Sequence, residues 1–324
     1  MEPPTGIKHS WCPINSGRPW ETISLSLAPD AWPFVSIIVP FYGDEIDALD
    51  RCVEAVMVQD YPGERFELVL VDNNPAPVVR DRYSGLARSP RIVHEPKAAG
   101  YQARNTGIEH ARGQALAFTD ADCQPDRGWL RHGVGMLNRD RGCGFVAGNI
   151  ALTFRDPKKP ALFEAADACF HLQQEAYVRN YHFGATANLL TWKSVIETAG
   201  PFDATLISQG DGEWGKRVWR LGYRQYYAKD AVVYHSARTT FGALAVKTRR
   251  LFGADFARGR AQGLARILRY ELGYQRLLLR WIAERRHEFG LRRIVGVYAV
   301  FGLVVAIRGV ELVRLLAGGR RERR

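Results

Sequence analysis

Short apolar runs alternate with helical periods along residues 35–119, and each run ends at a proline or a polar residue. Apolar residues at helical spacing over 44–60, and a segment after a glycine turn at 100–110, predict two helices. Four apolar runs predict buried strands, at 35–40, 66–71, 91–94 and 114–119. Strands that alternate with helices predict a parallel sheet with right-handed crossovers.

Distinctive residues stand at the carboxyl ends of three of these strands. Pro40 ends the first strand, Asp72 follows the second, and Asp120 and Asp122 follow the fourth. Because parallel sheets bind ligands beyond the carboxyl ends of their strands, we expect these residues to converge on one crevice. Two carboxylates at this spacing can reach one Mg2+ ion, which takes carboxylate and phosphate oxygens. The dinucleotide GxGxxG fingerprint and the P-loop GxxxxGK[ST] motif are both absent from the sequence.

The pattern between residues 129 and 235 is more mixed. Helical segments are predicted at 129–137, 161–178, 193–199 and 211–221, and extended segments at 144–154 and 186–192, with paired strands over 224–235. Asp211 and Glu213 fall in or just before the first turn of their predicted helix, where acids suit the positive end of the helix dipole.

The composition shifts after residue 236. Residues 241–286 are rich in Leu, Ala and Arg and predict amphipathic helices. An uncharged run of 14 residues follows at 294–307, whereas a bilayer span needs about 20. Only a segment that includes Arg308, Glu311 and Arg314 reaches that length. The pattern therefore favours an interfacial, re-entrant or buried helix over a true span.

Composition and charge limit the classes of protein and the cellular compartments to consider. The chain has 324 residues, 46% of them hydrophobic, and five cysteines without CxxC spacing, which argues against a disulfide framework or a zinc site. Residues 1–34 form a polar leader without the apolar stretch of a signal peptide. The net charge of +11 is concentrated late, with a basic tail at 318–324. Such charge suits nucleic acid or an anionic membrane, or is simply solvated.

Several segments together resemble the family 2 glycosyltransferases of GT-A fold. They are VSIIVPFYGD, VDNN, KAAGYQARNTGIEHARG, FTDADC and GDGEWGKRVWRLGY followed by VVYH, and they cover residues 35–235. The resemblance implies an α/β GT-A domain with a mostly parallel sheet flanked by helices. It also implies a nucleotide-diphosphate sugar donor, Mg2+ or Mn2+ as cofactor, and inversion at the anomeric carbon. Residues 236–324 would form a basic, membrane-associated helical region.

The resemblance also assigns roles on the donor side. Pro40, Phe41 and Tyr42 would line the nucleobase pocket, Asp72 would bond the base or ribose, and Lys97 and Arg104 would hold the nucleotide or its phosphates. Asp120 would contact ribose or metal, Asp122 would bind the metal, and His235 would complete the metal shell. From the residues alone, Asp72 could instead be a turn-forming acid, Arg104 a solvated helix residue and His235 a structural histidine.

On the acceptor side, the resemblance makes Asp211 the general base. The family usually has Glu-Asp here, whereas this chain has Gly210 before Asp211, and Glu213 is a candidate replacement for the missing acid. Trp214 would stack on a sugar or fill the core, and Asn188 would lie near the acceptor entrance. Asp211 and Glu213 could instead only cap their helix. The QxxRW motif of processive synthases is absent from the sequence, which favours transfer of a single sugar.

These observations favour an inverting transferase at the cytoplasmic face of the cell membrane, peripheral or monotopic. Its acceptor would be a lipid-linked or cell-surface glycan precursor, and no nucleic acid is expected as a partner. A sugar nucleotidyltransferase, which would release pyrophosphate, is one alternative. A basic nucleic-acid-binding protein is another, although the sequence shows no helix-turn-helix, zinc or RNA-recognition signature. A non-catalytic relative is the third, because of Gly210.

Overall fold

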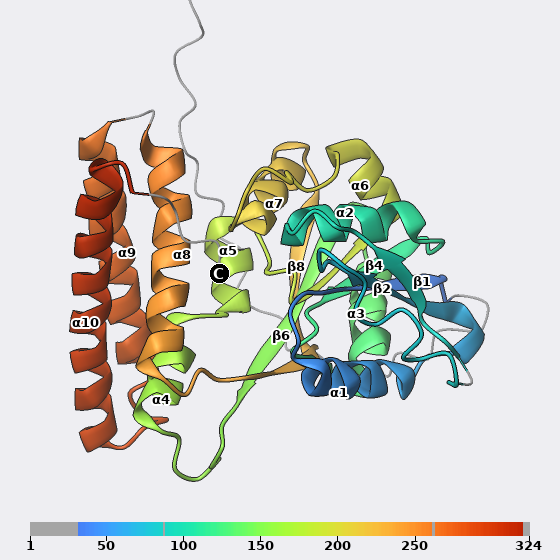
Figure 1. Ribbon diagram of the computed structural model, residues 1–324, viewed down its shortest axis with the longest axis horizontal. Helices are drawn as coiled ribbons and strands as arrows, with labels where there is room; N and C mark the ends of the chain where they lie inside the picture. Colours follow the sequence, from blue (N-terminus) through green and yellow to red (C-terminus); the bar gives the residue numbers. More distant parts are fainter. Residues whose placement is uncertain (1–31, 87, 261–262, 320–324) are drawn as a thin grey trace, which may run out of the picture.

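Figure 1 shows a computed structural model, which describes residues 32–86, 88–260 and 263–319. Most of the predicted leader and the end of the basic tail lie outside the described residues. A twisted sheet with helices on both faces forms one part of the molecule, and the long helices of the C-terminal region stand beside it as a second part (Figure 1). We call these parts the sheet unit, residues 32–236, and the helical unit, residues 237–319.

The sheet has eight strands within the described residues, in the order β3-β2-β1-β4-β7-β6-β8-β5. Strands β1 to β4 are all parallel, as predicted, whereas β7 is antiparallel to both its neighbours and β5 is antiparallel to β8. The strands are β1 (Val35–Phe41), β2 (Phe66–Asp72), β3 (Arg91–His94), β4 (Ala115–Thr119), β5 (Cys123–Pro125), β6 (Cys143–Thr153), β7 (Asn188–Trp192) and β8 (Arg224–Ser236). The predicted GT-A arrangement is confirmed as a mixed sheet whose first half is parallel.

Helices cover both faces of this sheet (Figure 1). On one face, α1 (Ile46–Met57) and α3 (Trp129–Asn138) contribute apolar side chains to one core, which also includes β1. On the other face lie α2 (Gly100–His110), α6 (Lys193–Ala199) and α7 (Gly210–Arg220). A short 3-10 helix, η2 (Gly63–Arg65), precedes β2. Helix α1 buries Leu49, Cys52, Val53 and Val56, the helical spacing that its sequence predicts.

Two segments differ from the sequence predictions. Residues 224–235 do not form paired strands but one long strand, β8, parallel to β6. Its register jumps from Gly148–Ala228 to Asn149–Val232, so the three residues between form a bulge that alternation alone does not reveal. The helix predicted at 161–178 is two helices, α4 (Leu162–Phe170) and α5 (Gln174–Tyr181), interrupted where Leu172 has a φ of 59°.

The helical unit confirms the predicted C-terminal helices. They are α8 (Phe241–Arg260), α9 (Leu264–Glu284) and α10 (Leu291–Leu316). Helix α8 faces the sheet unit and α10 lies outermost, while α4 packs at their base (Figure 1). An apolar cluster joins α4 to all three helices and includes Leu244, Leu278, Trp281 and Val297.

Helix α10 buries two charged residues of its second half, Arg308 and Glu311. The Arg308 guanidinium, 2% exposed, donates to Glu271 of α9 at 2.6 and 2.7 Å and to Asp255 of α8 at 3.1 Å. Glu311 is also buried, and it accepts from Arg314 at 2.5 and 2.7 Å. The opposite side of the helix exposes Leu291, Val295, Tyr298, Leu303, Val310, Val313 and Leu316. Among the described helices, α10 is the one long and apolar enough to cross a membrane.

Candidate active site

A cavity of about 1510 Å³ lies between the carboxyl edge of the parallel strands and the helical unit. Its floor is formed by residues that follow β1 and β4, and one side by α2 and α7. Helices α8 and α9 form the far wall. The cavity therefore sits where ligands bind in open α/β sheets, but the helical unit closes one side of it.

Ten of the residues that the sequence analysis selected line this cavity. They come from segments up to 195 positions apart in the chain, and they are Pro40, Phe41, Tyr42, Lys97, Arg104, Asp120, Asp122, Asp211, Glu213 and His235. The sheet topology brings them together, because β1 and β4 are neighbours and β8 returns to pair with β5.

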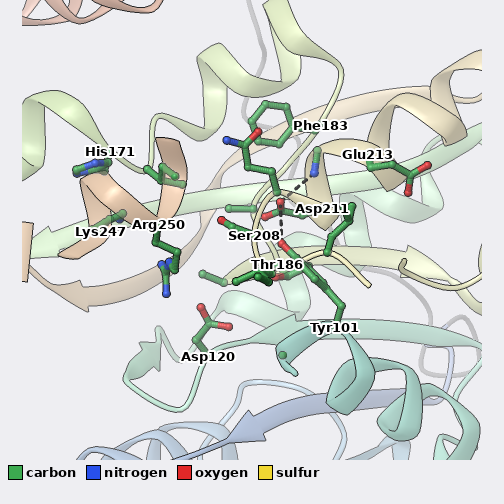
Figure 2. Close-up of a pocket in the computed structure, with 18 of the residues that line it drawn as sticks. Tyr101, Asp120, His171, Phe183, Thr186, Ser208, Asp211, Glu213, Lys247 and Arg250 are labelled. Atoms are coloured by element: carbon green, nitrogen blue, oxygen red, sulfur yellow. Dashed lines mark hydrogen bonds between the residues drawn. The ribbon is translucent and has the colours of Figure 1, made fainter. Parts of the chain in front are cut away.

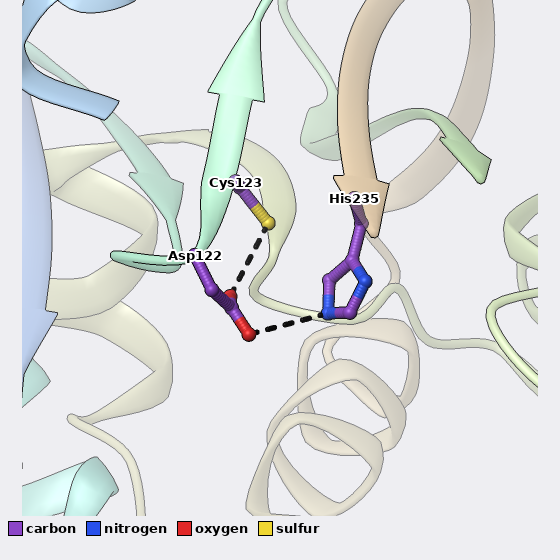
Figure 3. Close-up of side chains that lie close together, drawn as sticks. All are labelled: Asp122, Cys123 and His235. Atoms are coloured by element: carbon purple, nitrogen blue, oxygen red, sulfur yellow. Dashed lines mark hydrogen bonds and ion pairs between the residues drawn. The ribbon is translucent and has the colours of Figure 1, made fainter. Parts of the chain in front are cut away.

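Asp122 and His235 meet at the edge of the sheet. The chain turns after β4, and β5 then runs antiparallel to β8 with Cys123 opposite His235. This register brings His235 Nε2 to 3.5 Å from Asp122 Oδ2 (Figure 3). The Asp122 side chain is 52% exposed to the cavity, so the pair leaves room for further ligands of a cation.

The side chains around Asp122 fit a divalent cation whose remaining ligands come from a substrate. Cys123 lies within 4.8 Å of Asp122 and His235, but burial and then the nearby Asp122 and Asp120 carboxylates raise the pKa of its thiol well above normal. A protonated thiol is a poor ligand, and hard cations prefer oxygen. The ligands that fit are therefore the Asp122 carboxylate and the His235 imidazole, with the neighbouring Asp120 carboxylate and substrate oxygens.

Arg104 is a site residue rather than a solvated helix residue. Its side chain is 10% exposed and forms an ion pair with Asp120, while Nη1 donates to the Gly100 carbonyl at 2.9 Å. Helical spacing places Arg104 on the same face of α2 as Tyr101, and its guanidinium lies 5.6 Å from the centre of the Tyr101 ring. Helix α2 thus points a cation and an aromatic ring into the cavity.

Asp211 is the second residue of α7, and its side chain lines the cavity beside Tyr101 (Figure 2). The Tyr101 hydroxyl donates to Oδ1 at 3.2 Å, and the Gly212 backbone N–H donates to the same oxygen at 2.9 Å. Burial raises the pKa of this carboxyl above its ordinary value, although the Gly212 N–H, Arg104 and the Tyr101 hydroxyl act in the opposite direction. A carboxylate with a raised pKa is a stronger base than an exposed aspartate.

Tyr101 explains the glycine that departs from the family pattern. A Cβ at Gly210 would lie 2.7 Å from Cε2 of Tyr101 and almost as close to other ring atoms. The Tyr101 ring therefore occupies the space that the side chain of an acid at position 210 would need. Sequence reasoning missed this role of Tyr101, although a glycine in place of the acid pointed to a bulky neighbour.

Glu213 lines the cavity one turn beyond Gly210. Its carboxylate forms an ion pair with Arg217 at 2.9 Å, at helical spacing on α7. The structure therefore gives Glu213 a partner of its own, while leaving it 36% exposed.

The structure does not bring Asp72 to the cavity. The residue is 1% exposed, and its carboxylate accepts hydrogen bonds from Asn74 and from the backbone N–H groups of Val78 and Val79. These are the contacts of the turn-forming alternative, which leaves little capacity for a base or ribose. Its neighbour Asn73 lines the cavity instead.

Trp214 and Asn188 are also buried away from the cavity, both 0% exposed. Trp214 packs on Phe202 and Phe145 and donates to the Gly200 carbonyl at 3.1 Å, so the core-aromatic alternative holds. Asn188 accepts from Trp129 at 2.8 Å and donates to two backbone carbonyls. A side chain without exposed surface cannot stack on a sugar or contact an acceptor.

Cations on the far wall complete the cavity, and sequence reasoning did not select them. Arg238 follows β8, and Lys247 and Arg250 lie on α8. Burial, followed by nearby Arg238, lowers the pKa of Lys247 to about 7. The signal in the sequence was the spacing of three between Lys247 and Arg250, which places both on one face of a helix.

The profile of the family "Glycosyl transferase family 2" matches residues 36–199, half of the chain. The chain belongs to glycosyl transferase family 2. Glycosyltransferase AglE of Haloferax volcanii is 34% identical over 223 residues, which are 68% of this chain and 72% of that protein. This membership makes the protein a glycosyltransferase that uses a nucleotide sugar, and it leaves the nucleotidyltransferase and nucleic-acid-binding alternatives without support.

More distant relatives cover almost the whole chain. A Methanococcus voltae protein is 20% identical over 298 residues, 87% of this chain and 88% of its own length. It is named dolichyl N-acetyl-alpha-D-glucosaminyl phosphate 3-beta-D-2,3-diacetamido-2,3-dideoxy-beta-D-glucuronosyltransferase. A Pyrobaculum calidifontis mannosyltransferase, solved in complex with GDP-Man and Mn2+, superposes with a TM-score of 0.58 at 20% identity, covering 92% of this chain and 90% of that one. At this identity the superposition shows the fold, including the helical unit.

Proposed function

We propose that this family 2 enzyme transfers a single sugar, with inversion, from a nucleotide-diphosphate sugar to a hydroxyl of a lipid-linked acceptor. The observation that carries the proposal is the shared cavity of Asp122, His235 and Asp211. A carboxylate with a raised pKa faces the same space as a carboxylate–imidazole pair suited to a cation. A proton acceptor and a site for a leaving diphosphate are the two parts that a direct displacement needs.

Asp211 acts as the general base. The acceptor hydroxyl gives its proton to the Asp211 carboxylate while its oxygen bonds to the anomeric carbon, and the bond from that carbon to the diphosphate oxygen breaks. One displacement inverts the configuration. Tyr101 and the Gly212 N–H hold the carboxylate in place, so less conformational entropy is lost when the acceptor is positioned. Glu213 lies beside this path and is the proposed acceptor contact.

We assign the nucleotide-sugar donor to the carboxyl edge of the parallel strands. Pro40, Phe41 and Tyr42 would line the nucleobase position, and Lys97 and Arg104 would bind nucleotide oxygens. Asp122 and His235, with Asp120, would hold Mg2+ or Mn2+, which neutralises the charge that develops on the leaving diphosphate. The complex of the P. calidifontis mannosyltransferase with GDP-Man and Mn2+ supports this assignment.

We assign membrane contact to the outer surface of the helical unit. Its outer surface combines the apolar side of α10 with exposed Leu268, Leu272 and Leu279 of α9. The exposed arginines Arg269, Arg276 and Arg280 lie among these leucines. An apolar surface with interspersed cations suits an anionic leaflet. The protein would thus be peripheral or monotopic at the cytoplasmic face, and the dolichyl phosphate substrate in the name of the M. voltae relative supports a lipid-linked acceptor.

The test is release of nucleoside diphosphate from UDP- and GDP-sugars by the purified protein, with Mn2+ or with EDTA. We expect metal-dependent release that falls about 100- to 10,000-fold in Asp211→Asn, and a comparable loss in Asp122→Ala. Asp230→Asn is the matched control, because Asp230 is an exposed acid of the β8 bulge outside the cavity. Full activity in both site variants would refute the mechanism.

A further inference from the structure

Three cations from the start of the helical unit face the acidic edge of the sheet across the cavity. Arg238 follows β8, and Lys247 and Arg250 lie one turn apart on α8. Figure 2 shows Arg250 pointing into the space above Asp120, with Lys247 beside it. No ion pair within 4 Å joins Lys247 or Arg250 to an acid of the described residues, so an open gap separates the two walls.

Lys247 is buried without a hydrogen bond or a close ion pair among the described residues. Its side chain is 9% exposed and lines the cavity, yet within residues 32–86, 88–260 and 263–319 it has no hydrogen bond and no ion pair. Arg250 lies one turn further along α8, and its buried Nε also has no acceptor there. Burying charged donors without acceptors costs free energy, so a site that keeps them indicates an anionic ligand.

The nearest buried acid does not supply the missing acceptors. Asp167 of α4 is 0% exposed, and its two oxygens already accept from His171 at 2.7 Å and from the Arg238 backbone and guanidinium at 3.0 and 3.2 Å. Burial lowers the pKa of His171 to about 3, so this histidine is neutral and adds no charge. The Asp167 carboxylate is therefore bonded to Arg238 and offsets Lys247 only through space, so the charge at this wall stays positive.

We propose that Arg238, Lys247 and Arg250 form a second oxyanion site, which binds a phosphate group of a substrate opposite the metal edge. The proposal rests on the glycosyl transfer proposed above. Arginine offers a planar fork to phosphate oxygens, and lysine binds phosphate as a point charge. Two substrates of the reaction carry such a group: the donor has a diphosphate, and a lipid-linked acceptor has a phosphate next to its lipid.

The experiment measures equilibrium binding rather than turnover. Two probes are used: UDP or GDP with Mn2+, and a short-chain polyprenyl phosphate in detergent micelles, with the matching polyprenol as its phosphate-free control. The variants are Lys247→Gln and Arg250→Gln, each checked for folding by circular dichroism. Arg139→Gln is the charge-matched control, because Arg139 is exposed on the sheet unit outside the cavity.

We expect each site variant to weaken binding of at least one probe about tenfold, a change of about 1.4 kcal/mol, and Arg139→Gln to leave both unchanged. A loss confined to the nucleotide assigns the site to the donor diphosphate, and a loss confined to the polyprenyl phosphate assigns it to the acceptor. Because Arg250 is more exposed than Lys247, Arg250→Gln keeps the test decisive if Lys247→Gln does not fold. Unchanged binding of both probes by a folded variant overturns the proposal, whereas failure of the wild type to bind any nucleotide counts against the proposed function instead.

Discussion

The sheet unit and the helical unit distribute charge in opposite ways. The sheet unit buries Val35, Ile37 and Phe118, and apart from the buried Asp167, next to the helical unit, its ion pairs lie mostly at the surface or in the cavity. The helical unit buries the Arg308 ion pairs and Glu311, while leucines and valines cover its outer surface. The apolar cluster of the helical unit is also smaller and lies mainly at the end of the helices next to α4.

This difference indicates that the two units meet different surroundings. A polar surface over an apolar core is the arrangement that water favours. An exposed apolar surface of this extent marks an interaction site, and charges in apolar surroundings are tolerated when they are turned inward and paired. The cavity lies between the two units, so the proposed water-borne donor and the proposed lipid-borne acceptor would each reach it from its own side.

The largest effect is expected from removing the buried cation of the helical unit. Arg308→Ala leaves the buried Glu271 carboxylate without the guanidinium that donates to it and removes one donor to Asp255. We expect the free energy of unfolding to fall by about 3–5 kcal/mol. Denaturant unfolding in mild detergent measures it. A loss of less than about 1 kcal/mol in the free energy of unfolding would show that water reaches these charges. The helical unit would then not differ from the sheet unit in how it buries charge.

A charge placed on the exposed apolar side of α10 tests whether this side of the helical unit binds a membrane. Val310→Asp places a carboxylate on the apolar side, and we expect binding to anionic phospholipid vesicles in flotation assays to fall about tenfold, or about 1.4 kcal/mol. The matched control is Val58→Asp in the sheet unit, since Val58 and Val310 are 61% and 70% exposed. Equal loss in both variants would mean that charge repulsion, rather than an apolar docking surface, causes it.

In the sheet unit, the next largest effect is expected from a polar group that lines the cavity, the Tyr101 hydroxyl. Tyr101→Phe removes the hydroxyl that helps to keep the pKa of Asp211 down. The pKa then rises further, and a base must be ionised to act, so the acid limb of the kcat/KM profile should move to higher pH. We expect about a fivefold loss of activity near pH 6, or about 1 kcal/mol. A uniform loss at every pH, without a shift of the limb, would make Tyr101 a packing residue only.

The smallest effects are expected from exposed ion pairs, one in each unit. Arg280–Glu284 on α9 and Arg179–Glu175 on α5 are alike in spacing, with arginine side chains 75% and 71% exposed. We expect Arg280→Ala and Arg179→Ala each to change the free energy of unfolding in water by less than about 0.5 kcal/mol. A much larger effect of Arg280→Ala alone would indicate that α9 is shielded from water even without a membrane.

The strands and the placement of the acids followed from local sequence. The apolar runs at 35–40 and 66–71 became β1 and β2 almost to the residue, because strands buried on both faces need continuous apolar residues. The rule that parallel strands present their carboxyl ends together placed Asp120 and Asp122 in the cavity. Asp211 reached it only through the resemblance, since its helix lies far along the chain.

The remaining site residues depended on tertiary contacts that no local pattern contains. The burial of Trp214 and Asn188 comes from packing on residues between 12 and 69 positions away. Asp72 was misplaced because a strand-end acid that ties its own turn has the same sequence pattern as one that binds a ligand. The charges of α10 argued against a membrane span, but the sequence analysis did not use their spacing, which puts Arg308 and Glu311 on one side of the helix, away from its exposed apolar side.

The buried Arg308 ion pairs also constrain how the protein is made. Asp255 and Glu271 emerge from the ribosome before their cation, which follows Glu271 by 37 residues. Until α10 is synthesised and docked, Glu271 of α9 lacks the guanidinium that it accepts from, and burying a carboxylate without a cation costs several kcal/mol. The packing of α8 against α9, which forms one wall of the cavity, is therefore expected to be completed only after translation has passed Arg308.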